Sequence, residues 1–258
     1  AYVLLILDSL KKKDFKKAKI YLDDLSKFKE QGTVELAIYE TLRDYKYVFQ
    51  NKKIPIIKSN FGSLTLISKA FQNCYLSNKK ARSYFVNLIN GSETDHSKYI
   101  FFLVNHLVEE NKIEEAKKIS DQINILKSSL IVSQTKKWVE ENKLEKFNKV
   151  FSCKNESDVL SEFFYVFANI YSSQNNLEKS IFYMNISYYL NPKFKFNLAL
   201  SVEDFFNNKK YKQSEKILNN FSKEDDIFYW YKIRKTSKII FEEFGEENNY
   251  WYNPKTGI

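Results

Sequence analysis

Few residues in this 258-residue chain combine the types and spacing that catalysis or metal binding requires. Its only histidines are His96 and His106, and it has no HExxH motif, glycine-rich phosphate loop or GxSxG motif. Glu93, Asp95 and His96 offer three metal ligands, but they crowd into a four-residue loop segment. His106 falls instead in a mostly apolar helical segment. The sequence therefore predicts a non-enzymatic protein without a resident metal or cofactor.

Adjacent acidic residues recur along the chain as Glu109–Glu110, Glu114–Glu115 and Glu140–Glu141. Neighbouring residues on a helix point about 100° apart, so these pairs cannot act as carboxylate dyads. They indicate solvated helix ends rather than acid–base sites.

The two cysteines, Cys74 and Cys153, lie far apart and outside any CxxC motif. Neither a disulfide framework nor a zinc site is indicated by this spacing. We expect both thiols to pack as small apolar residues.

A formal net charge of +9 raises the alternative of a nucleic-acid or anionic-lipid partner. Lysine outnumbers arginine 38 to 3, however, and asparagine, isoleucine, phenylalanine and tyrosine are abundant. All of these residues have A/T-rich codons, so drift in an A/T-rich genome accounts for the composition. Nucleic-acid readers rely more on arginine. Nucleic acid is therefore the less favoured partner, and a basic surface module stays as the alternative function.

Three prolines and five glycines are few for this length, which favours long helices with short connections. No apolar run is long enough for a membrane span. The chain begins at Ala1, and its first apolar run precedes its lysines, the reverse of a signal peptide. We expect a fragment or processed form, cytoplasmic unless an upstream signal is missing, and a larger enzyme with catalysis upstream is a remote alternative.

A fixed period relates two segments near the end of the chain. The matched pairs are Tyr171 with Phe205, Leu177 with Tyr211, Ser180 with Ser214, Met184 with Leu218 and Ser187 with Phe221. A constant period of this size, about 34 residues, is typical of helical repeat proteins. Ser180, Met184 and Ser187 share one helix face, where the small residues let a neighbouring helix approach. Pro192 ends that helix.

The unit over residues 161–194 resembles the tetratricopeptide repeat, a helix–turn–helix unit of the same period. It has large, small and aromatic residues in the family's order: Phe164, Phe167, Ala168, Tyr171, Ser180, Met184, Ser187 and Pro192. A weaker unit covers 195–228. The order of units is similar to that of divergent bacterial repeat proteins of the alphaproteobacterial type, which are mostly interaction scaffolds.

The resemblance implies an all-α, right-handed superhelical solenoid of antiparallel helix pairs over residues 1–245. The second-helix anchors recur at intervals close to the same period, namely Ala81, Ala116, Phe147, Ser180 and Ser214. We expect about a dozen helices of about 10–17 residues, each unit contacting its neighbours. A helix over 33–50 should break before Pro55, a capping helix should cover 226–244, and 246–258 should form a tail that folds back or docks a partner.

In tetratricopeptide arrays the first helices of successive units line a concave face. The resemblance implies that the same face in this chain forms a partner-binding groove. Its residues would be Phe101, Asn105, Val108, Tyr165, Asn169, Ser172, Phe196, Glu203 and Phe206. Asn105 and Asn169 stand where some members hold a peptide backbone or terminal carboxylate, but Phe101 and Tyr165 replace the lysines of that clamp. The groove suits an extended or helical peptide with apolar anchors. Alternatively, these aromatic residues only pack against neighbouring units.

Overall fold

The computed structural model describes residues 1–56, 59–91, 97–125 and 128–244. Over these residues the chain forms fourteen α-helices and no β-strand, which confirms the predicted all-α class. The helices are α1 (Tyr2–Lys11), α2 (Phe15–Leu25), α3 (Thr33–Asn51), α4 (Ser63–Tyr75), α5 (Lys80–Ile89), α6 (Tyr99–Glu109), α7 (Ile113–Asp121), α8 (Leu130–Glu140), α9 (Glu145–Val150), α10 (Glu156–Ser173), α11 (Leu177–Leu190), α12 (Leu198–Asn207), α13 (Tyr211–Leu218) and α14 (Ile227–Phe244). Short 3₁₀ helices cover Ser26–Gln31 (η1), Lys195–Asn197 (η3) and Lys223–Asp225 (η4). Helix length varies more than expected, from 6 residues in α9 to 19 in α3.

One kind of turn joins six pairs of successive helices. Each turn contains a non-glycine residue with left-handed backbone, φ between 51° and 58°, and these residues are Lys13, Ser77, Asn111, Asn142, Asn175 and Lys209. The next residue donates its N–H to a carbonyl five positions back, as from Asn176 to Tyr171 at 2.9 Å. This bond satisfies a carbonyl left unpaired at the end of the first helix. The same local geometry therefore reverses the chain at each of these positions.

Small residues lie where helices come closest, as the spacing predicts. Ala81, Ala116, Ala168, Ser180 and Ser187 are all 0–1 % exposed. The hydroxyl of Ser180 donates to Asp204 on α12 at 2.5 Å, so its burial leaves no unpaired donor. Large residues of the repeat pattern are also buried, namely Phe164, Phe167, Tyr171, Met184 and Leu218.

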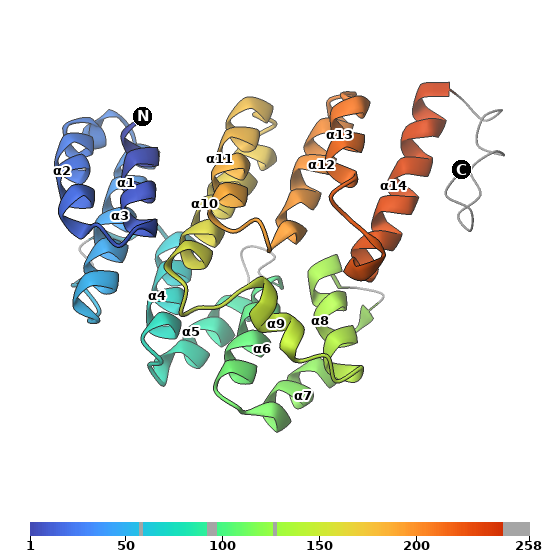
Figure 1. Cartoon of the computed structure of the whole chain (residues 1–258), viewed down its shortest axis with the longest axis horizontal. Helices are drawn as coiled ribbons and strands as arrows, with labels where there is room; N and C mark the ends of the chain where they lie inside the picture. The colour runs from blue at the N-terminus through green and yellow to red at the C-terminus, as the bar shows by residue number, and fades with distance from the viewer. Residues whose placement is uncertain (57–58, 92–96, 126–127, 245–258) are drawn as a thin grey trace.

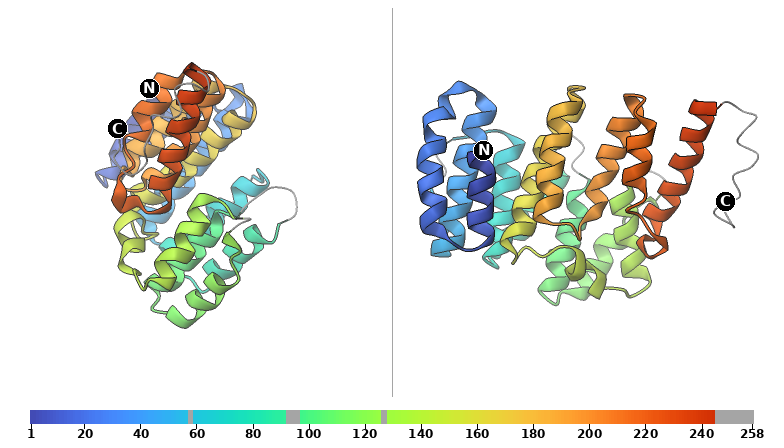
Figure 2. Two further views of the ribbon diagram at one scale, coloured as in Figure 1. Left: turned by 90° about the vertical axis from the view of Figure 1, so that its right-hand side faces the viewer. Right: turned by 45° about the horizontal axis from the view of Figure 1, so that its top comes forward.

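The helices form two layers (Figures 1 and 2). Helices α5–α9 lie in one layer, and α1–α3 with α10–α14 lie in the other. Helix α10 contacts both α1 and α4, and α14 contacts α8. The Tyr75 hydroxyl donates to Glu156 at 2.7 Å, and the Lys13 ammonium lies 3.6 Å from the same carboxylate. These contacts between distant segments depart from the expectation that each unit contacts only its neighbours.

The prediction that Cys74 and Cys153 are separate thiols is wrong. Both residues are fully buried, but a disulfide joins them, with an S–S distance of 2.10 Å. The bond ties the end of α4 to the segment between α9 and α10. Their separation of 79 residues carries no spacing signal, because the pairing depends on how the two layers pack.

The predicted helix over 33–50 is confirmed as α3, and the chain leaves helical structure before Pro55. The predicted terminal helix over 226–244 corresponds to α14. The tail at 246–258 and the Glu93, Asp95 and His96 cluster lie outside the described residues. Among the helices of the described ranges, none has the length and apolarity needed to cross a membrane.

Candidate functional site

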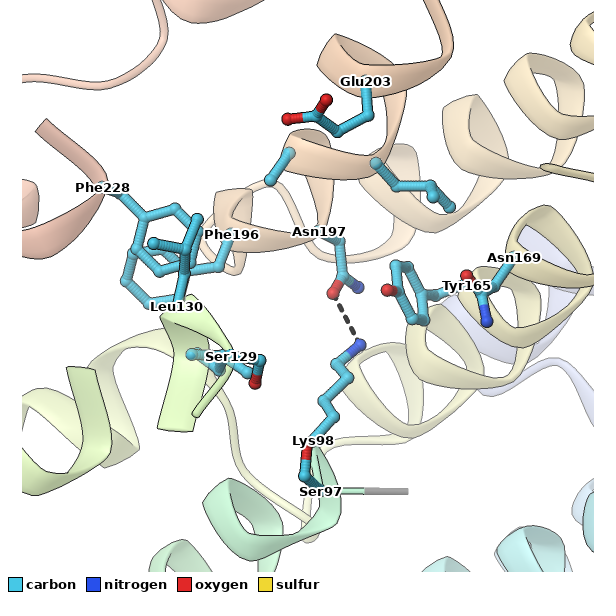
Figure 3. A pocket seen from close by; sticks show the side chains of 13 residues that line it. Ser97, Lys98, Ser129, Leu130, Tyr165, Asn169, Phe196, Asn197, Glu203 and Phe228 are labelled. Atoms are coloured by element: carbon cyan, nitrogen blue, oxygen red, sulfur yellow. Dashed lines mark hydrogen bonds between the residues drawn. The ribbon is translucent and has the colours of Figure 1, made fainter. Parts of the chain in front are cut away.

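A cavity of about 510 Å³ opens where α8, α10, α12 and α14 converge with the start of α6. Its lining comes from segments that are far apart in sequence: Ser97, Lys98, Ser129, Leu130, Ile131, Tyr165, Asn169, Phe196, Asn197, Ala199, Leu200, Glu203 and Phe228. In Figure 3, Lys98 (just before α6), Asn197 (η3), Tyr165 and Asn169 (both α10) lie on one side, and Phe196, Phe228 and Leu130 lie on the other. We call this cavity the Lys98 cavity.

A buried ion pair lies at the polar side of the Lys98 cavity. The Lys98 ammonium is 2.8 Å and 2.9 Å from the two carboxylate oxygens of Glu162, which is only 1 % exposed. The ammonium also donates to Asn197 Oδ1 at 2.7 Å and lies 3.2 Å from the Tyr165 ring centroid. Figure 3 shows Lys98, Asn197 and Tyr165 pointing toward one another. The Lys98–Glu162 pair makes this side of the cavity polar without giving it a net charge.

Burial shifts the ionisation of this pair. It lowers the pKa of Lys98 to about 8, although the Glu162 carboxylate opposes the shift. Burial likewise raises the pKa of Glu162, against the effect of Lys98 and Asn197. The Lys98 ammonium is engaged with Glu162 and Asn197, so the site presents hydrogen-bonding groups rather than an unhindered nucleophile.

One donor at the cavity, Asn197 Nδ2, has no partner at hydrogen-bond geometry among the described residues, although the Asn197 side chain is close enough to Glu162 to lower the pKa of that carboxyl. Asn197 is 6 % exposed, and its Oδ1 accepts from Lys98. A buried N–H without a partner costs folding free energy, about 1–3 kcal/mol. A bound carbonyl oxygen would recover that cost. The exposed amide of Asn169 lines the same cavity and offers a second donor and acceptor.

The opposite wall is aromatic and apolar. Phe196 stacks on Phe228 with ring centroids 4.4 Å apart, and it also packs against Trp138 at 5.8 Å. Leu130 lies beside these rings in Figure 3, and Leu200 also lines the cavity. The stacked rings hold a fixed apolar surface, because each ring is supported by another from a different helix.

A second cavity of about 500 Å³ adjoins the first, and both are lined by Leu130. Its other lining residues are Ile227, Trp230, Tyr231, Arg234, Lys235 and Lys238, all on α14. We call it the α14 cavity. Glu203 of the Lys98 cavity accepts from the Tyr231 hydroxyl at 2.7 Å and from Lys235 at 2.6 Å, which connects the two linings. Trp230 is 59 % exposed, so a large apolar side chain faces solvent beside basic residues.

Four of the nine residues predicted to form a groove lie together in the Lys98 cavity: Tyr165, Asn169, Phe196 and Glu203. Phe101 and Asn105 are 0 % exposed, because α6 is enclosed in the layer that contains α5–α9. The Asn105 amide donates to the Phe151 carbonyl at 2.9 Å and therefore serves the core.

The remaining three predicted residues lie outside both cavity linings. Val108 is half-buried against the core. The Ser172 hydroxyl donates to Asp204 at 2.5 Å. The Phe206 ring packs on Tyr211 and beneath the ammonium groups of Lys235 and Lys238.

The sequence interpretation missed Lys98, Glu162 and Asn197. One signal was present, since Glu162 interrupts a strongly apolar helix stretch just before Phe163 and Phe164. A charge at such a position needs a buried partner. Nothing local identifies that partner, because Lys98 lies 64 residues away and Asn197 lies 99 residues from Lys98.

Comparison of the chain with protein-family models, with characterised proteins and with solved structures gives no match.

Proposed function

We propose that this protein is a non-catalytic scaffold that binds a peptide segment of a partner protein in the Lys98 and α14 cavities. The observation that carries the proposal is the open Lys98 cavity itself, which combines a stacked aromatic wall with the Nδ2 donor of Asn197. Binding pockets characteristically pair apolar walls with a few oriented polar groups.

The regular turns support the repeat architecture on which the proposal rests. The left-handed turn residues Ser77, Asn111, Asn142, Asn175 and Lys209 follow one another at a nearly constant interval. This interval is close to that of a helix–turn–helix unit of about 34 residues and favours the resemblance to tetratricopeptide repeats. We propose a solenoid of such units, right-handed as in that family, in which α10 and α12 are first helices facing the partner.

The chemistry of the two cavities defines the peptide. An apolar anchor such as leucine or phenylalanine fits against Phe196, Phe228 and Leu130. Its backbone carbonyl can accept from Asn197 Nδ2. An acidic residue further along the peptide would face Arg234 and Lys238, which are exposed on α14. The expected ligand is therefore an acidic segment with an apolar anchor.

Fluorescence anisotropy with two matched peptide libraries tests this proposal. Both libraries carry one leucine or phenylalanine anchor, and they differ in having aspartate or lysine at the flanking positions. We expect the aspartate library to bind. Leu200→Glu places a charge in the Lys98 cavity and should weaken binding at least about tenfold, the change that 1.4 kcal/mol produces.

Leu66→Glu is the matched control, because Leu66 is an exposed leucine on α4 outside both cavities. Its binding should equal that of the wild type. If Leu200→Glu binds as tightly as Leu66→Glu, the Lys98 cavity is not the peptide site. Equal binding of the lysine library would refute the acidic ligand. Retention on DNA at physiological salt with no peptide binding would favour the alternative basic module.

A further inference from the structure

Four side chains with metal-ligating atoms gather around the disulfide, away from the proposed peptide site. Single ligand atoms of Cys74, Cys153 and Glu109 all lie within 4.8 Å of one another. His106 Nδ1 lies 3.4 Å from Cys74 Sγ. These residues come from α4, α6 and the segment before α10. From these contacts we infer that the reduced protein binds one zinc ion through Cys74, Cys153, His106 and Glu109.

The helix geometry of α6 places two of the ligands together. His106 and Glu109 are three residues apart, so their side chains share one face of the helix. Glu109 Oε2 is buried without a hydrogen-bond partner among the described residues. His106 is only 4 % exposed, and its Nδ1 lies beside Cys74 Sγ. Both side chains therefore lie beside the disulfide.

The separation between Cys74 and His106 fits a tetrahedral zinc site. His106 lies more than 4.8 Å from at least one of the other ligand atoms, so its ring must move toward them when the disulfide is opened. Zn–S bonds of about 2.3 Å and Zn–N bonds of about 2.0 Å place a sulfur and a nitrogen ligand about 3.5 Å apart. The observed separation between Cys74 Sγ and His106 Nδ1 is 3.4 Å. Two zinc-bound sulfurs would stand about 3.8 Å apart, inside the 4.8 Å that encloses the Cys74, Cys153 and Glu109 ligand atoms.

The donor set selects zinc over the hard cations. Thiolate and imidazole ligands favour zinc, whereas calcium and magnesium require oxygen ligands. Two thiolates and one carboxylate carry three negative charges, which a divalent ion and the nearby Lys154 ammonium balance. Lys154 donates to the Cys74 carbonyl at 2.8 Å, so its charge lies beside the site. A cation at this position also favours the thiolate form.

The site is opened by reduction. A dithiol reductant supplies two electrons and two protons, the S–S bond breaks, and the reductant leaves as a disulfide. Zinc then displaces one proton from each thiol into solvent. In the oxidised protein the disulfide links α4 to the segment before α10, and in the reduced protein zinc would link these two segments to each other and to α6. Helix α4 would thus stay linked to the segment before α10 in both redox states.

Cobalt(II) is the first probe, because tetrahedral thiolate coordination gives it intense visible bands and a thiolate-to-metal charge-transfer band. The chain of residues 1–258 is titrated with Co²⁺ before and after reduction, with thiol titration to verify two free cysteines. We expect one Co²⁺ per reduced chain, displaced by Zn²⁺, and none in the oxidised chain. Cys74→Ser with Cys153→Ser should abolish the bands.

Glu109→Gln should weaken Co²⁺ binding at least about tenfold, while the adjacent Glu110→Gln, which is outside the ligand set, should not. Circular dichroism follows the fold during reduction. If reduction lowers helicity, added Zn²⁺ must restore it. A reduced chain with two titratable thiols that takes up no metal overturns the inference. So does equal binding by the oxidised chain or by the double cysteine variant.

Discussion

Removal of the Cys74–Cys153 cross-link should lower the free energy of unfolding by several kcal/mol. The disulfide closes a loop between residues 79 positions apart. In the chain-entropy model, a loop of this length restricts the unfolded chain by about 4.5 kcal/mol at 25 °C. The effect is large because stability of a domain is about 5–15 kcal/mol in total.

Urea unfolding monitored by circular dichroism measures this difference. Comparison of oxidised with reduced wild type isolates the cross-link, since both forms retain the two buried sulfur atoms. A chelator is present throughout, so that bound metal cannot replace the disulfide. The dependence of the unfolding free energy on urea should also become steeper, because the unfolded chain exposes more surface without the cross-link.

The double variant Cys74→Ala/Cys153→Ala serves as the second test. Both cysteines are fully buried, so loss of the sulfur atoms adds a cavity term to the lost cross-link. The variant should therefore be less stable than the reduced wild type, and reductant should not change it. If oxidised and reduced wild type differ by less than about 1 kcal/mol, the chain-entropy reasoning fails for this protein.

Three further predictions concern the core and the charged groups. Ala168→Leu overpacks a fully buried helix contact and should cost about 1–3 kcal/mol in thermal unfolding; an unchanged melting temperature would show that the contact is loose. Burial tends to raise the pKa of Asp226, but hydrogen bonds from Lys146, Trp138 and Lys137 together lower it below the ordinary 3.8. Asp226→Asn should therefore be less stable than wild type at neutral pH, and this difference in unfolding free energy should shrink as pH falls below 3.8. If the difference stays the same in acid, the charge of Asp226 is not what stabilises the wild type. Burial lowers the pKa of Lys98 from 10.5 to about 8, so the unfolded chain holds the extra proton between these values. The stability of wild type relative to Lys98→Met should rise with pH in that window, by at most about 1.4 kcal/mol per pH unit, and a flat difference would contradict the shift.

Most of the helical structure could be predicted from local patterns in the sequence. The small residues Ala168, Ser180 and Ser187 could be assigned to close helix contacts because helical spacing places them on defined faces. The end of α3 before Pro55 was also predictable, since proline cannot continue a helix. The disulfide and the contact of α10 with α1 and α4 could not be predicted, because they depend on how one layer folds against the other.

The site was predictable only where its residues lie on an accessible helix face. Asn169 on α10 and Glu203 on α12 are 34 residues apart and both line the cavity, as the register of the repeat period implies. The register alone could not show that Phe101 and Asn105 are buried rather than part of a groove. Their exposure depends on how the two layers of helices pack around α6. Lys98 and Glu162 form an ion pair between segments far apart in the sequence, and no single segment encodes such a pair.

The division of charge between the two cavities predicts separable roles in binding. Lys98 and Glu162 neutralise each other, so the Lys98 cavity should contribute apolar contacts and hydrogen bonds that slow dissociation. Arg234 and Lys238 are exposed, so they should act mainly on association and be screened by salt. Substitution of both by glutamate should therefore slow association of an aspartate-library peptide at low salt and change its dissociation little.

Stopped-flow anisotropy separates these rates. Leu200→Glu should accelerate dissociation instead, because it places a charge in the Lys98 cavity. Lys16→Glu is the charge control, since Lys16 is an exposed lysine on α2, at the other end of the molecule from α14 (Figure 1). If Lys16→Glu slows association as much as the α14 substitutions do, net charge rather than the α14 cavity guides the peptide. If the α14 substitutions act on dissociation alone, those basic residues stabilise the bound complex rather than guide its formation, and the proposed division of roles is wrong.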